Sequence, residues 1–435
     1  MRRRLTLVAL VLAAGVALAA QSAVERRPAA ALAAAPDRLA RIDLALQQYI
    51  DDSRVAGIVA LVLQDGRPVY EKAFGWSDKE AGRRMTVDTI FRIASQTKAI
   101  TSTAILSLVE EGKIGLNDPA GRFIPSFTTT TVAVRNPPGS APLIGSGVTF
   151  APARRPITIR DLLTHTAGIS YGTQNDIAAV YEAKGLGPAA GLGWYTADKN
   201  EPICDTMERL GTLPFLAQPG EAWVYGYNTD VLGCIVERAS GMPLDQFVRT
   251  RVTEPLGMRD THFYLAAGQR DRLAAVYASG SGGRIARAPD GSKGQGSYVD
   301  GPRRSFAGGA GLLSTARDYA RFLEMIRNGG ALDGVRILAP RTVQLMTTNQ
   351  VGTLHSPNGL GFGLGFETTD RYGANGMDPV GAYGWGGAYG TMYRVDPQAR
   401  LVILLMTQLV PNATDVREKF PTLVYQALVE PPHER

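Results

Sequence analysis

The N-terminal part of the chain changes from a helical to a strand-like pattern of apolar residues. Apolar residues recur every three or four positions between Pro36 and Asp52, which predicts an amphipathic helix. Two apolar stretches follow, at residues 55–63 and 69–76, and the polar segment 64–67 between them is typical of a hairpin turn. This end of the chain therefore predicts a helix followed by a β-hairpin.

The C-terminal part mirrors this arrangement. Residues 383–395 and 401–408 have the composition of strands, and Asp396-Pro397 marks a turn between them. Residues 416–429 then predict a closing helix. Both ends of the chain can thus build one antiparallel sheet with helices on its faces.

The middle of the chain has a different character. Residues 157–164, 228–240 and 315–328 have helical periodicity, and the connections between them are rich in glycine and proline. No repeat of solenoid or propeller length is visible. We therefore predict an α+β fold, in which an antiparallel sheet flanked by helices is interrupted by an inserted, mainly helical domain.

These patterns also suggest boundaries. The sheet part is expected at about residues 37–95 and 330–430, and the helical part at about 96–329, so that one unit spans 37–430. A cleft between two such parts is where small-molecule sites tend to lie.

The first residues predict an export signal. Three arginines precede a short apolar stretch, and Ala17-Leu18-Ala19 supplies small residues for cleavage. We expect a signal peptide at residues 1–19, a flexible leader at 20–36 and a periplasmic or secreted protein. The apolar stretch is short and rich in alanine, so no stable membrane span is expected.

Composition places the 435-residue chain among ordinary globular proteins, with 45% hydrophobic and 20% charged residues. Loss of the three signal-peptide arginines lowers the formal net charge from +6 to +3. The chain has no run of lysine or arginine with interleaved aromatic residues, which makes nucleic acid and anionic membrane surfaces poor partners. The sequence leaves the oligomeric state undetermined.

Cysteine and histidine give no sign of a metal site. Cys204 and Cys234 could form a disulfide in an oxidising compartment or remain two buried thiols. The four histidines show no metal-ligand spacing. We expect neither a metal nor another cofactor.

The strongest chemical signal is Ser95-Gln96-Thr97-Lys98, which is the only Ser-x-x-Lys pattern in the sequence. If the following residues are helical, Ser95 stands at a helix N-terminus, where backbone N–H groups favour developing negative charge. Lys98 then lies one turn further on the same side. Removal of water lowers the pKa of a lysine, so a buried amine can act as a base near neutral pH. The pattern therefore predicts a serine nucleophile with a lysine base.

A simpler interpretation of the same residues is an N-cap serine followed by a solvated lysine in the first helical turn. The largely apolar residues 99–108 argue against it, because they predict a helix that is buried on all sides.

Two tyrosines precede the predicted helix 228–240, in the segment Trp223-Val224-Tyr225-Gly226-Tyr227-Asn228. A phenol within hydrogen-bond reach of a lysine can relay a proton between nucleophile, amine and leaving group. Aromatic residues serve more often in packing, so this segment alone does not identify a site.

Glycines cluster in the predicted strand near the C-terminus, in Gly384-Trp385-Gly386-Gly387-Ala388-Tyr389-Gly390. Glycine in a strand indicates close approach of a ligand or of another backbone. An acyl-transfer site needs backbone donors for an oxyanion, which the N–H groups of Ser95 and of this strand could supply. The alternative is a bend in an edge strand.

Taken in order, Ser95-Gln96-Thr97-Lys98, Trp223-Val224-Tyr225 and Trp385-Gly386-Gly387 resemble the motifs of serine β-lactamase-like hydrolases. Over roughly residues 40–425 the chain is most similar to family VIII carboxylesterases, which are related to class C β-lactamases and DD-peptidases. Segments 162–169 and 311–315 also resemble connecting segments of that family. The resemblance implies a β-lactamase/DD-peptidase-like fold and a serine hydrolase.

Carried over by position, the resemblance implies Ser95 as the acylated nucleophile, Lys98 as its base and Tyr225 as the proton relay. The N–H groups of Ser95 and Ala388 would form the oxyanion hole. The other substrate-binding candidates are Trp385, Gly386, Gly387, Tyr227 and Asn228. Tyr227 is a less favoured choice for the relay.

Two departures from the β-lactamase pattern bear on the substrate. The Tyr-x-Asn motif becomes Tyr225-Gly226-Tyr227, with Asn228 one place late. Trp385 replaces the lysine that helps to hold the carboxylate of penicillins and D-alanyl peptides. Loss of a charge-assisted contact weakens anion binding, whereas a neutral ester needs no such partner.

The sequence therefore favours a serine carboxylesterase that cleaves small or short-chain esters and allows promiscuous β-lactam cleavage. The alternatives are a β-lactamase or D-amino-acid peptidase, and a non-catalytic binding protein of the same fold.

A competing nucleophile motif is Gly168-Ile169-Ser170-Tyr171-Gly172, which matches the Gly-x-Ser-x-Gly elbow of α/β-hydrolases. That elbow requires a strand-to-helix turn, whereas the preceding residues predict a helix and a loop. We therefore interpret Ser170 as non-catalytic.

Overall fold

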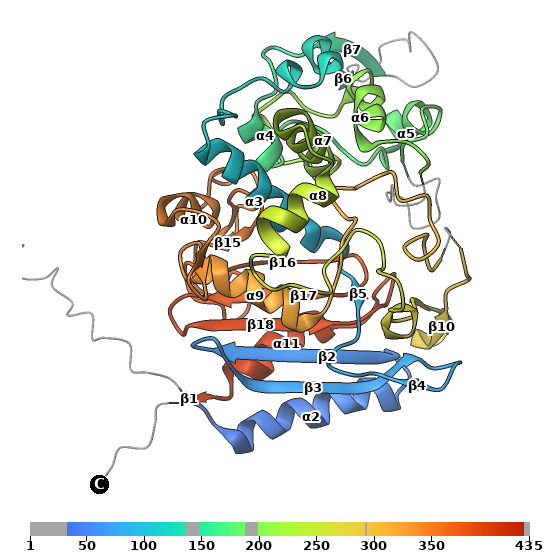
Figure 1. Ribbon diagram of the computed structural model, residues 1–435, viewed down its shortest axis with the longest axis vertical. Helices are drawn as coiled ribbons and strands as arrows, with labels where there is room; N and C mark the ends of the chain where they lie inside the picture. The colour runs from blue at the N-terminus through green and yellow to red at the C-terminus, as the bar shows by residue number, and fades with distance from the viewer. Residues whose placement is uncertain (1–32, 136–147, 188–198, 292–293, 430–435) are drawn as a thin grey trace, which may run out of the picture.

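An eight-stranded antiparallel sheet joins the two ends of the chain (Figure 1). It is seen in a computed structural model that describes residues 33–135, 148–187, 199–291 and 294–429. β2 (Gly57–Gln64) pairs with β18 (Leu401–Met406), which confirms that both ends contribute to one sheet. The predicted signal peptide and most of the predicted leader lie outside the described residues.

The strand order is β14-β15-β16-β17-β18-β2-β3-β4. The predicted strand 383–395 is divided into β16 and β17 by a glycine-rich turn, which the hydrogen bond from Gly387 N to Thr391 O closes at 2.8 Å. The other strands of the sheet are β3 (Arg67–Asp78), β4 (Arg83–Arg84), β14 (Leu360–Phe362), β15 (Glu367–Thr369), β16 (Tyr383–Gly386) and β17 (Met392–Asp396).

Helices cover both faces of the sheet. Successive side chains of its central strands point to opposite faces and therefore pack into two separate clusters. From β2, Ile58 and Val62 pack into one cluster with α2 (Pro36–Asp51) and α11 (Val416–Tyr425). Val59 and Leu61 belong to the larger cluster on the other face, where α9 (Ala316–Arg327) packs against β2 and β18.

The ends of the chain differ slightly from the prediction. α2 is the predicted first helix, whereas α11 ends at Tyr425, before the predicted boundary. The residues that follow form β19 (Leu428–Val429), which pairs with β1 (Ala33–Ala34).

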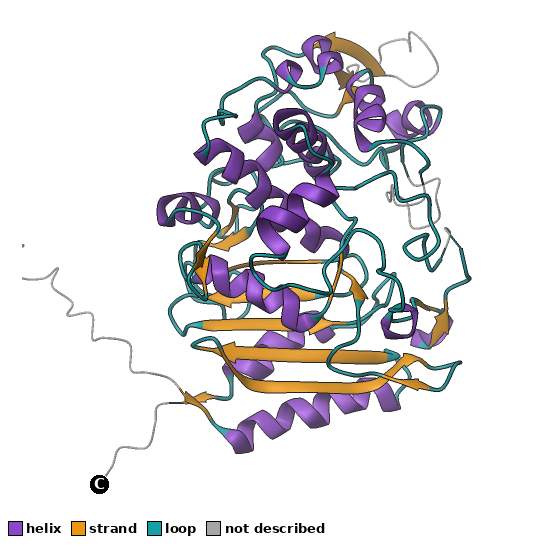
Figure 2. Cartoon of the chain, viewed as in Figure 1, coloured by secondary structure: helices purple, strands orange, loops and turns teal. Residues whose placement is uncertain are grey.

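The middle of the chain forms a group of helices that lies above the sheet in Figure 2. These helices are α3 (Thr97–Glu110), α4 (Ile159–Leu163), α5 (Asn175–Glu182), α6 (Ile203–Gly211), α7 (Asn228–Ser240) and α8 (Leu244–Val248), and α10 (Pro340–Met346) follows later in the chain. The exact division into two parts stays a prediction. No helix in the described ranges is long and apolar enough to cross a membrane.

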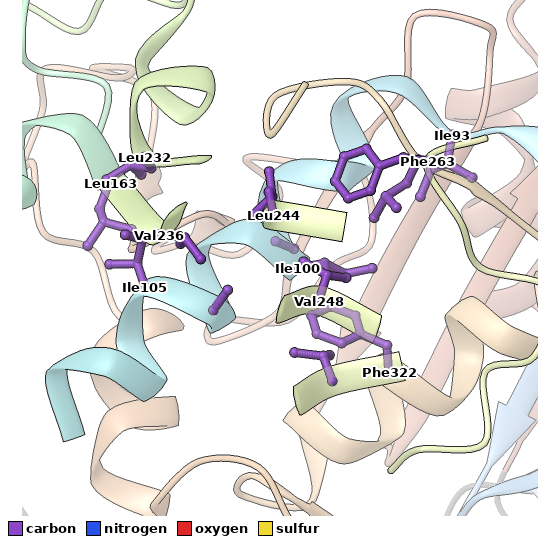
Figure 3. Packing of buried hydrophobic residues seen from close by; sticks show 14 of the residues in the cluster. Ile93, Ile100, Ile105, Leu163, Leu232, Val236, Leu244, Val248, Phe263 and Phe322 are labelled. Atoms are coloured by element: carbon purple, nitrogen blue, oxygen red, sulfur yellow. The ribbon is translucent and has the colours of Figure 1, made fainter. Parts of the chain in front are cut away.

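The centre of the helical group is α3, whose residues 97–108 are all buried. Figure 3 shows Ile100 and Ile105 of α3 among side chains of α7 and α8 such as Val236 and Val248. Each apolar side chain buried in this way contributes roughly 1.5–3 kcal/mol. The prediction of a helix buried on all sides is confirmed, so a polar side chain on α3 has to find its partners inside the protein.

A disulfide between Cys204 and Cys234 joins α6 to α7, with an S–S distance of 2.05 Å. The sequence left open whether these two cysteines pair, because their spacing fits either state. The packing of α6 against α7 brings them together.

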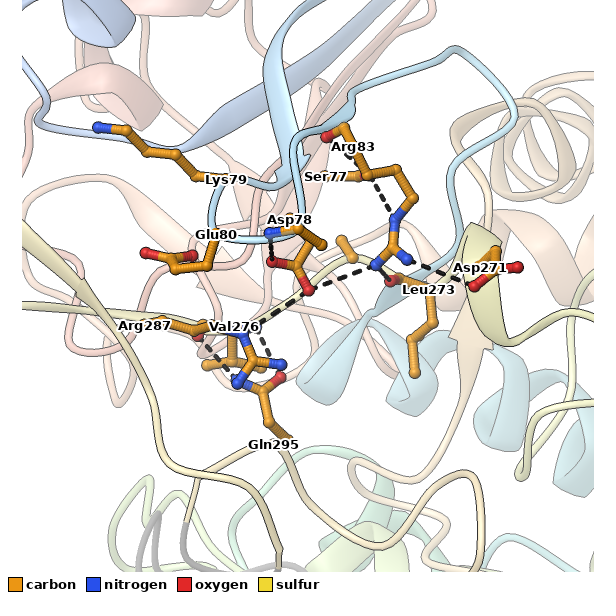
Figure 4. A network of polar contacts seen from close by, with 12 residues as sticks. Ser77, Asp78, Lys79, Glu80, Arg83, Asp271, Leu273, Val276, Arg287 and Gln295 are labelled. Atoms are coloured by element: carbon orange, nitrogen blue, oxygen red, sulfur yellow. Dashed lines mark hydrogen bonds and ion pairs between the residues drawn. The ribbon is translucent and has the colours of Figure 1, made fainter.

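Short strands and ion pairs secure the connections around the sheet. In Figure 4, Asp78 forms ion pairs with Arg83 at 3.5 Å and with Arg287 at 3.7 Å, which tie the end of β3 to a neighbouring hairpin. The short strands are β5 (Phe91–Arg92) with β11 (Leu313–Ser314), β9 (Tyr277–Ser279) with β10 (Ile285–Arg287), β12 (Ala331–Leu332) with β13 (Val335–Arg336), and β6 (Thr131–Arg135) with β7 (Val148–Pro152) and β8 (Pro214–Phe215).

Candidate active site

Ser95 lies in a single 3₁₀ turn, Ala94–Gln96, that leads directly into α3. The residue before it, Ala94, is buried and has a left-handed φ of 43°. This conformation costs a residue with a Cβ about 1–2 kcal/mol, so the surrounding packing must impose it. β5, just before this turn, is held by β11, and Ser95 is fixed at the helix start that the sequence predicted.

Lys98 is buried, with 1% of its surface exposed, and its amine is surrounded by oxygen atoms. The amine nitrogen Nζ lies 2.8 Å from the carbonyl oxygen of Gly309, 3.0 Å from the Tyr171 hydroxyl and 3.4 Å from Ser95 Oγ. A solvated first-turn lysine is therefore excluded. A neutral amine has two N–H donors and one lone pair, so Gly309 and Tyr171 can take the donors while the lone pair is directed at the serine hydroxyl.

A glycine-rich segment, residues 307–311, carries the Gly309 carbonyl to Lys98. The Gly308 carbonyl accepts a hydrogen bond from Thr101 Oγ1 of α3 at 2.8 Å, and Gly309 N donates to Asp230 Oδ1 of α7 at 3.1 Å. A Cβ on Gly308 would lie 2.6 Å from the Thr229 carbonyl oxygen. A Cβ on Gly309 would lie 2.4 Å from Asp230 Oδ2. Only glycine lets this segment pass between α3 and α7.

Asp230 is a buried carboxylate beside this segment. Burial raises the pKa of Asp230 from 3.8 to about 6, and the nearby Lys98 charge and the Gly309 N–H act in the opposite direction. The group is thus ionised at neutral pH and faces the lysine from the side of α7.

Two phenols connect Lys98 to the glycine-rich strand. Burial, followed by the neighbouring Tyr225, raises the pKa of Tyr171 well above its ordinary value, so Tyr171 stays a neutral phenol. The Tyr225 ring lies 4.6 Å from Lys98 Nζ, and its hydroxyl accepts a hydrogen bond from Trp385 Nε1 at 3.2 Å. Lys98, Tyr171, Tyr225 and Trp385 therefore form a continuous polar path.

The sequence did not identify Tyr171 as part of this path. It follows Ser170 in the Gly-x-Ser-x-Gly motif, and no local pattern distinguished it. Ser170 itself is fully buried and accepts a hydrogen bond from Gly172 N at 3.0 Å. It follows α4 and a loop rather than a strand, so the geometry of the hydrolase elbow is missing.

Tyr227 and Asn228, which the sequence placed among the substrate-binding candidates, are engaged elsewhere. The Tyr227 hydroxyl accepts a hydrogen bond from Gly187 N at 3.0 Å. Asn228 Nδ2 lies 3.0 Å from His165 Nδ1 and is buried at the start of α7. Neither side chain lines the cavity described next.

A cavity of about 670 Å³ opens beside Ser95. It brings together most of the residues that the sequence selected, from three separate parts of the chain. Its lining consists of Ser95, Tyr171, Thr173, Tyr225, Leu360, Glu367, Asn375, Trp385, Gly386, Gly387, Ala388, Arg394 and Arg417. Its size suits a small organic molecule.

The glycine-rich turn after β16 approaches the backbone next to Ser95. A Cβ on Gly387 would lie 2.5 Å from the carbonyl oxygen of Ile93, which explains the need for glycine there. The next residue, Ala388, lines the cavity, and its N–H donates no hydrogen bond to another described residue. This donor can serve a developing oxyanion together with the N–H of Ser95.

The described residues hold no group of three or more His, Cys, Asp or Glu side chains that could bind a metal ion.

Comparisons with known proteins agree with this geometry. A protein-family model described as Beta-lactamase matches residues 42–427. Esterase EstB of Burkholderia gladioli is 35% identical over 384 residues, which cover 85% of this chain and 90% of that protein. Lovastatin esterase of Penicillium rubens is 30% identical over 386 residues, covering 83% and 90%.

Solved structures show the same fold. The structure titled EstCE1, a hydrolase with promiscuous acyltransferase activity, aligns with a TM-score of 0.74 at 28% sequence identity. The alignment covers 90% of this chain and 98% of that chain. The predicted α+β fold of the β-lactamase and DD-peptidase type is thereby confirmed.

Proposed function

The chain belongs to the β-lactamase family, and we propose that it is a serine carboxylesterase that cleaves small or short-chain esters through an acyl-enzyme on Ser95. One observation carries the proposal: the buried amine of Lys98 lies 3.4 Å from the Ser95 hydroxyl, at the edge of a cavity that holds an unused backbone donor, Ala388. The names of two relatives, Esterase EstB and lovastatin esterase, support ester cleavage.

The reaction begins when Ser95 Oγ attacks the carbonyl carbon of the ester and Lys98 takes the hydroxyl proton. The negative charge that develops on the carbonyl oxygen is stabilised by the N–H groups of Ser95 and Ala388. As the C–O bond to the alcohol breaks, the proton passes from Lys98 to the departing oxygen through Tyr225. Water then attacks the acyl-enzyme by the same route, releases the acid and restores Ser95.

The test is a comparison of two serines in intact-protein mass spectrometry. Wild-type protein mixed with p-nitrophenyl butyrate is expected to gain one butyryl group and to release a burst of p-nitrophenol if deacylation is slow. Ser95→Ala is expected to lose both signals, whereas Ser170→Ala, which removes a buried hydroxyl of the same kind, retains them. Acylation of Ser95→Ala with unchanged turnover would refute the proposal.

The same assay separates the alternative functions. Faster turnover of nitrocefin or of a D-alanyl peptide than of the ester would identify a β-lactamase or a D-amino-acid peptidase. Absence of any adduct, also with a fluorophosphonate probe, would identify a binding protein on the same fold.

We also propose that the protein is exported. The residues before 20 support this, as does the disulfide between Cys204 and Cys234, since such bonds persist mainly in oxidising compartments. The mass of the mature protein recovered from the periplasm of a bacterial host tests it. Full-length protein retained in the cytoplasm would contradict it.

A further inference from the structure

Arg417, near the start of α11, reaches the cavity from the opposite end of the sequence. Its guanidinium lies against the end of β16, two residues before the proposed oxyanion donor Ala388, because a Cβ on Gly386 would stand only 2.2 Å from Arg417 Nη2. The absence of a side chain at Gly386 thus makes room for this arginine. Nothing in the sequence pattern of α11 singled it out.

The guanidinium of Arg417 makes no hydrogen bond or ion pair with another described residue. Its Nε is buried and without a partner. Buried polar groups nearly always have partners in folded proteins. Burial lowers the pKa of Arg417 below its ordinary value, yet an arginine side chain remains protonated in water at any physiological pH. A lasting positive charge therefore borders the cavity without an ion-pair partner among the described residues.

The other charged residues of the cavity are paired with each other, and Glu418, which follows Arg417 on α11, acts on its charge without forming an ion pair with it. Arg394 lies 3.1 Å from Asp378 and 3.5 Å from Glu367, and Glu367 also accepts from His355 at 3.0 Å. Among the charged residues that line the cavity, Glu367 offsets Arg394, and Arg417 remains. A second hollow, of about 240 Å³, shares Asn375, Arg394 and Arg417 with the first.

We propose that Arg417 binds a carboxylate carried by the substrate, so that the enzyme prefers esters with a free carboxylate, such as half-esters of short dicarboxylic acids. A guanidinium presents two parallel donors that match the two oxygens of a carboxylate. The inference rests on the proposed ester cleavage at Ser95 and adds the class of substrate. It also revises the sequence argument from Trp385: the lysine is absent from the strand, but α11 brings a cation to the same cavity.

The carboxylate can belong to the acyl group or to the alcohol, and two substrate pairs distinguish these cases. Monomethyl glutarate, compared with methyl butyrate, places the charge on the acyl side. 4-Acetoxybutanoate, compared with butyl acetate, places it on the alcohol side. For at least one pair, kcat/KM of the wild-type enzyme is expected to favour the charged ester. Preference for the neutral member of both pairs would overturn the inference.

Arg417→Met removes the charge while keeping a long side chain. It is expected to lower kcat/KM for the preferred charged ester by about 10- to 100-fold, the range for a hydrogen bond to a charged group. Turnover of its neutral counterpart should change little. Arg67→Met, at an exposed position of β3, removes the same charge far along the sheet and should leave the ratio of charged to neutral turnover unchanged. Equal losses for both esters in Arg417→Met would indicate a structural role only.

Binding without turnover separates this inference from the proposed function. In Ser95→Ala, the preferred half-ester is expected to raise the melting temperature, and in Ser95→Ala with Arg417→Met this shift should disappear. The carboxylate subsite is refuted if Ser95→Ala shows no shift and Arg417→Met leaves the ratio of charged to neutral ester turnover unchanged. Acylation of Ser95 is not affected by that result. Wild-type protein that cleaves no ester at all would instead refute the proposed function.

Discussion

Two basic side chains contribute to this site, Lys98 behind Ser95 and Arg417 in the lining of the cavity, and the protein treats them in opposite ways. Lys98 is 1% exposed, and three oxygen atoms of other residues lie within 3.4 Å of its amine. Arg417 is half-buried, and its guanidinium has no acceptor among the described residues. Lys98 is held in place by the fold, whereas Arg417 offers its donors to a ligand that enters the cavity.

The difference follows from what each group has to do. A base must be positioned before the substrate arrives, because misplacement of about 1 Å can reduce the rate roughly 100-fold. Its contacts therefore belong to the protein. A group that selects substrates gains specificity when its donors remain unsatisfied until the correct ligand binds, since a wrong ligand leaves a buried charge unpaired.

The largest effect is expected from Lys98→Met, which keeps the shape of the side chain and removes the amine. Loss of a general base should lower kcat by about 10²- to 10⁴-fold. If Lys98 and Arg417 have separate roles, Lys98→Met lowers the turnover of charged and neutral esters by the same factor. The ratio of charged to neutral turnover then stays at the wild-type value. Steady-state kinetics on the two ester pairs measure both quantities.

Lys113→Met serves as the matched control, because Lys113 is exposed just beyond α3 and its loss leaves the cavity intact. Activity of Lys98→Met within tenfold of the wild type would contradict the role of the amine as base.

The local parts of this arrangement could be predicted from the sequence. Ser95 and Lys98 are one helical turn apart, so their proximity depends only on the helix that the apolar residues of α3 require. The hairpin β2–β3 and helices such as α7 follow for the same reason, because each is specified by the periodicity of its own residues. The glycines after Trp385 also marked a close backbone approach, which occurs at Ile93.

The partners of Lys98 and the position of Arg417 could not be predicted, because tertiary packing determines both. Tyr171 and Gly309 are separated from Lys98 by 73 and 211 positions. Each lies in a loop, and its local sequence does not indicate a contact with Lys98. Arg417 lies on an amphipathic helix, where an arginine is normally expected to face solvent. Tyr227 was misleading for a related reason: it adjoins Tyr225, but the start of α7 directs it to Gly187.

Gly309→Ala is expected to disturb Lys98 indirectly, because the added methyl group meets Asp230 rather than the lysine. The added methyl group would lie 2.4 Å from Asp230 Oδ2, so the segment or the carboxylate must shift, and such overpacking typically costs about 1–3 kcal/mol. We expect kcat/KM to fall about tenfold for both members of each ester pair, the equivalent of about 1.4 kcal/mol.

The double variant Gly309→Ala, Asp230→Ala provides the control, because it removes the carboxylate that the new methyl group meets. It should be more active than Gly309→Ala alone, and such non-additivity is expected only for residues in contact. A double variant whose loss equals the product of the two single losses would show that the segment does not position the lysine.

The smallest effect on turnover is expected from Asp230→Asn, which keeps an oxygen for the Gly309 N–H and removes only the charge. Its signature is a change in stability with pH. The pKa of Asp230 is raised to about 6 in the folded protein from 3.8, so folding favours the protonated carboxyl. The stability that it contributes is present below pH 4 and is lost as the pH rises to 6, by at most about 3 kcal/mol. Urea unfolding between pH 4 and pH 7 should therefore show the wild type losing stability relative to Asp230→Asn. Parallel curves of stability against pH for the two proteins would mean that burial does not disfavour the ionised carboxylate of Asp230. Lys98 would then be held by its hydrogen bonds alone.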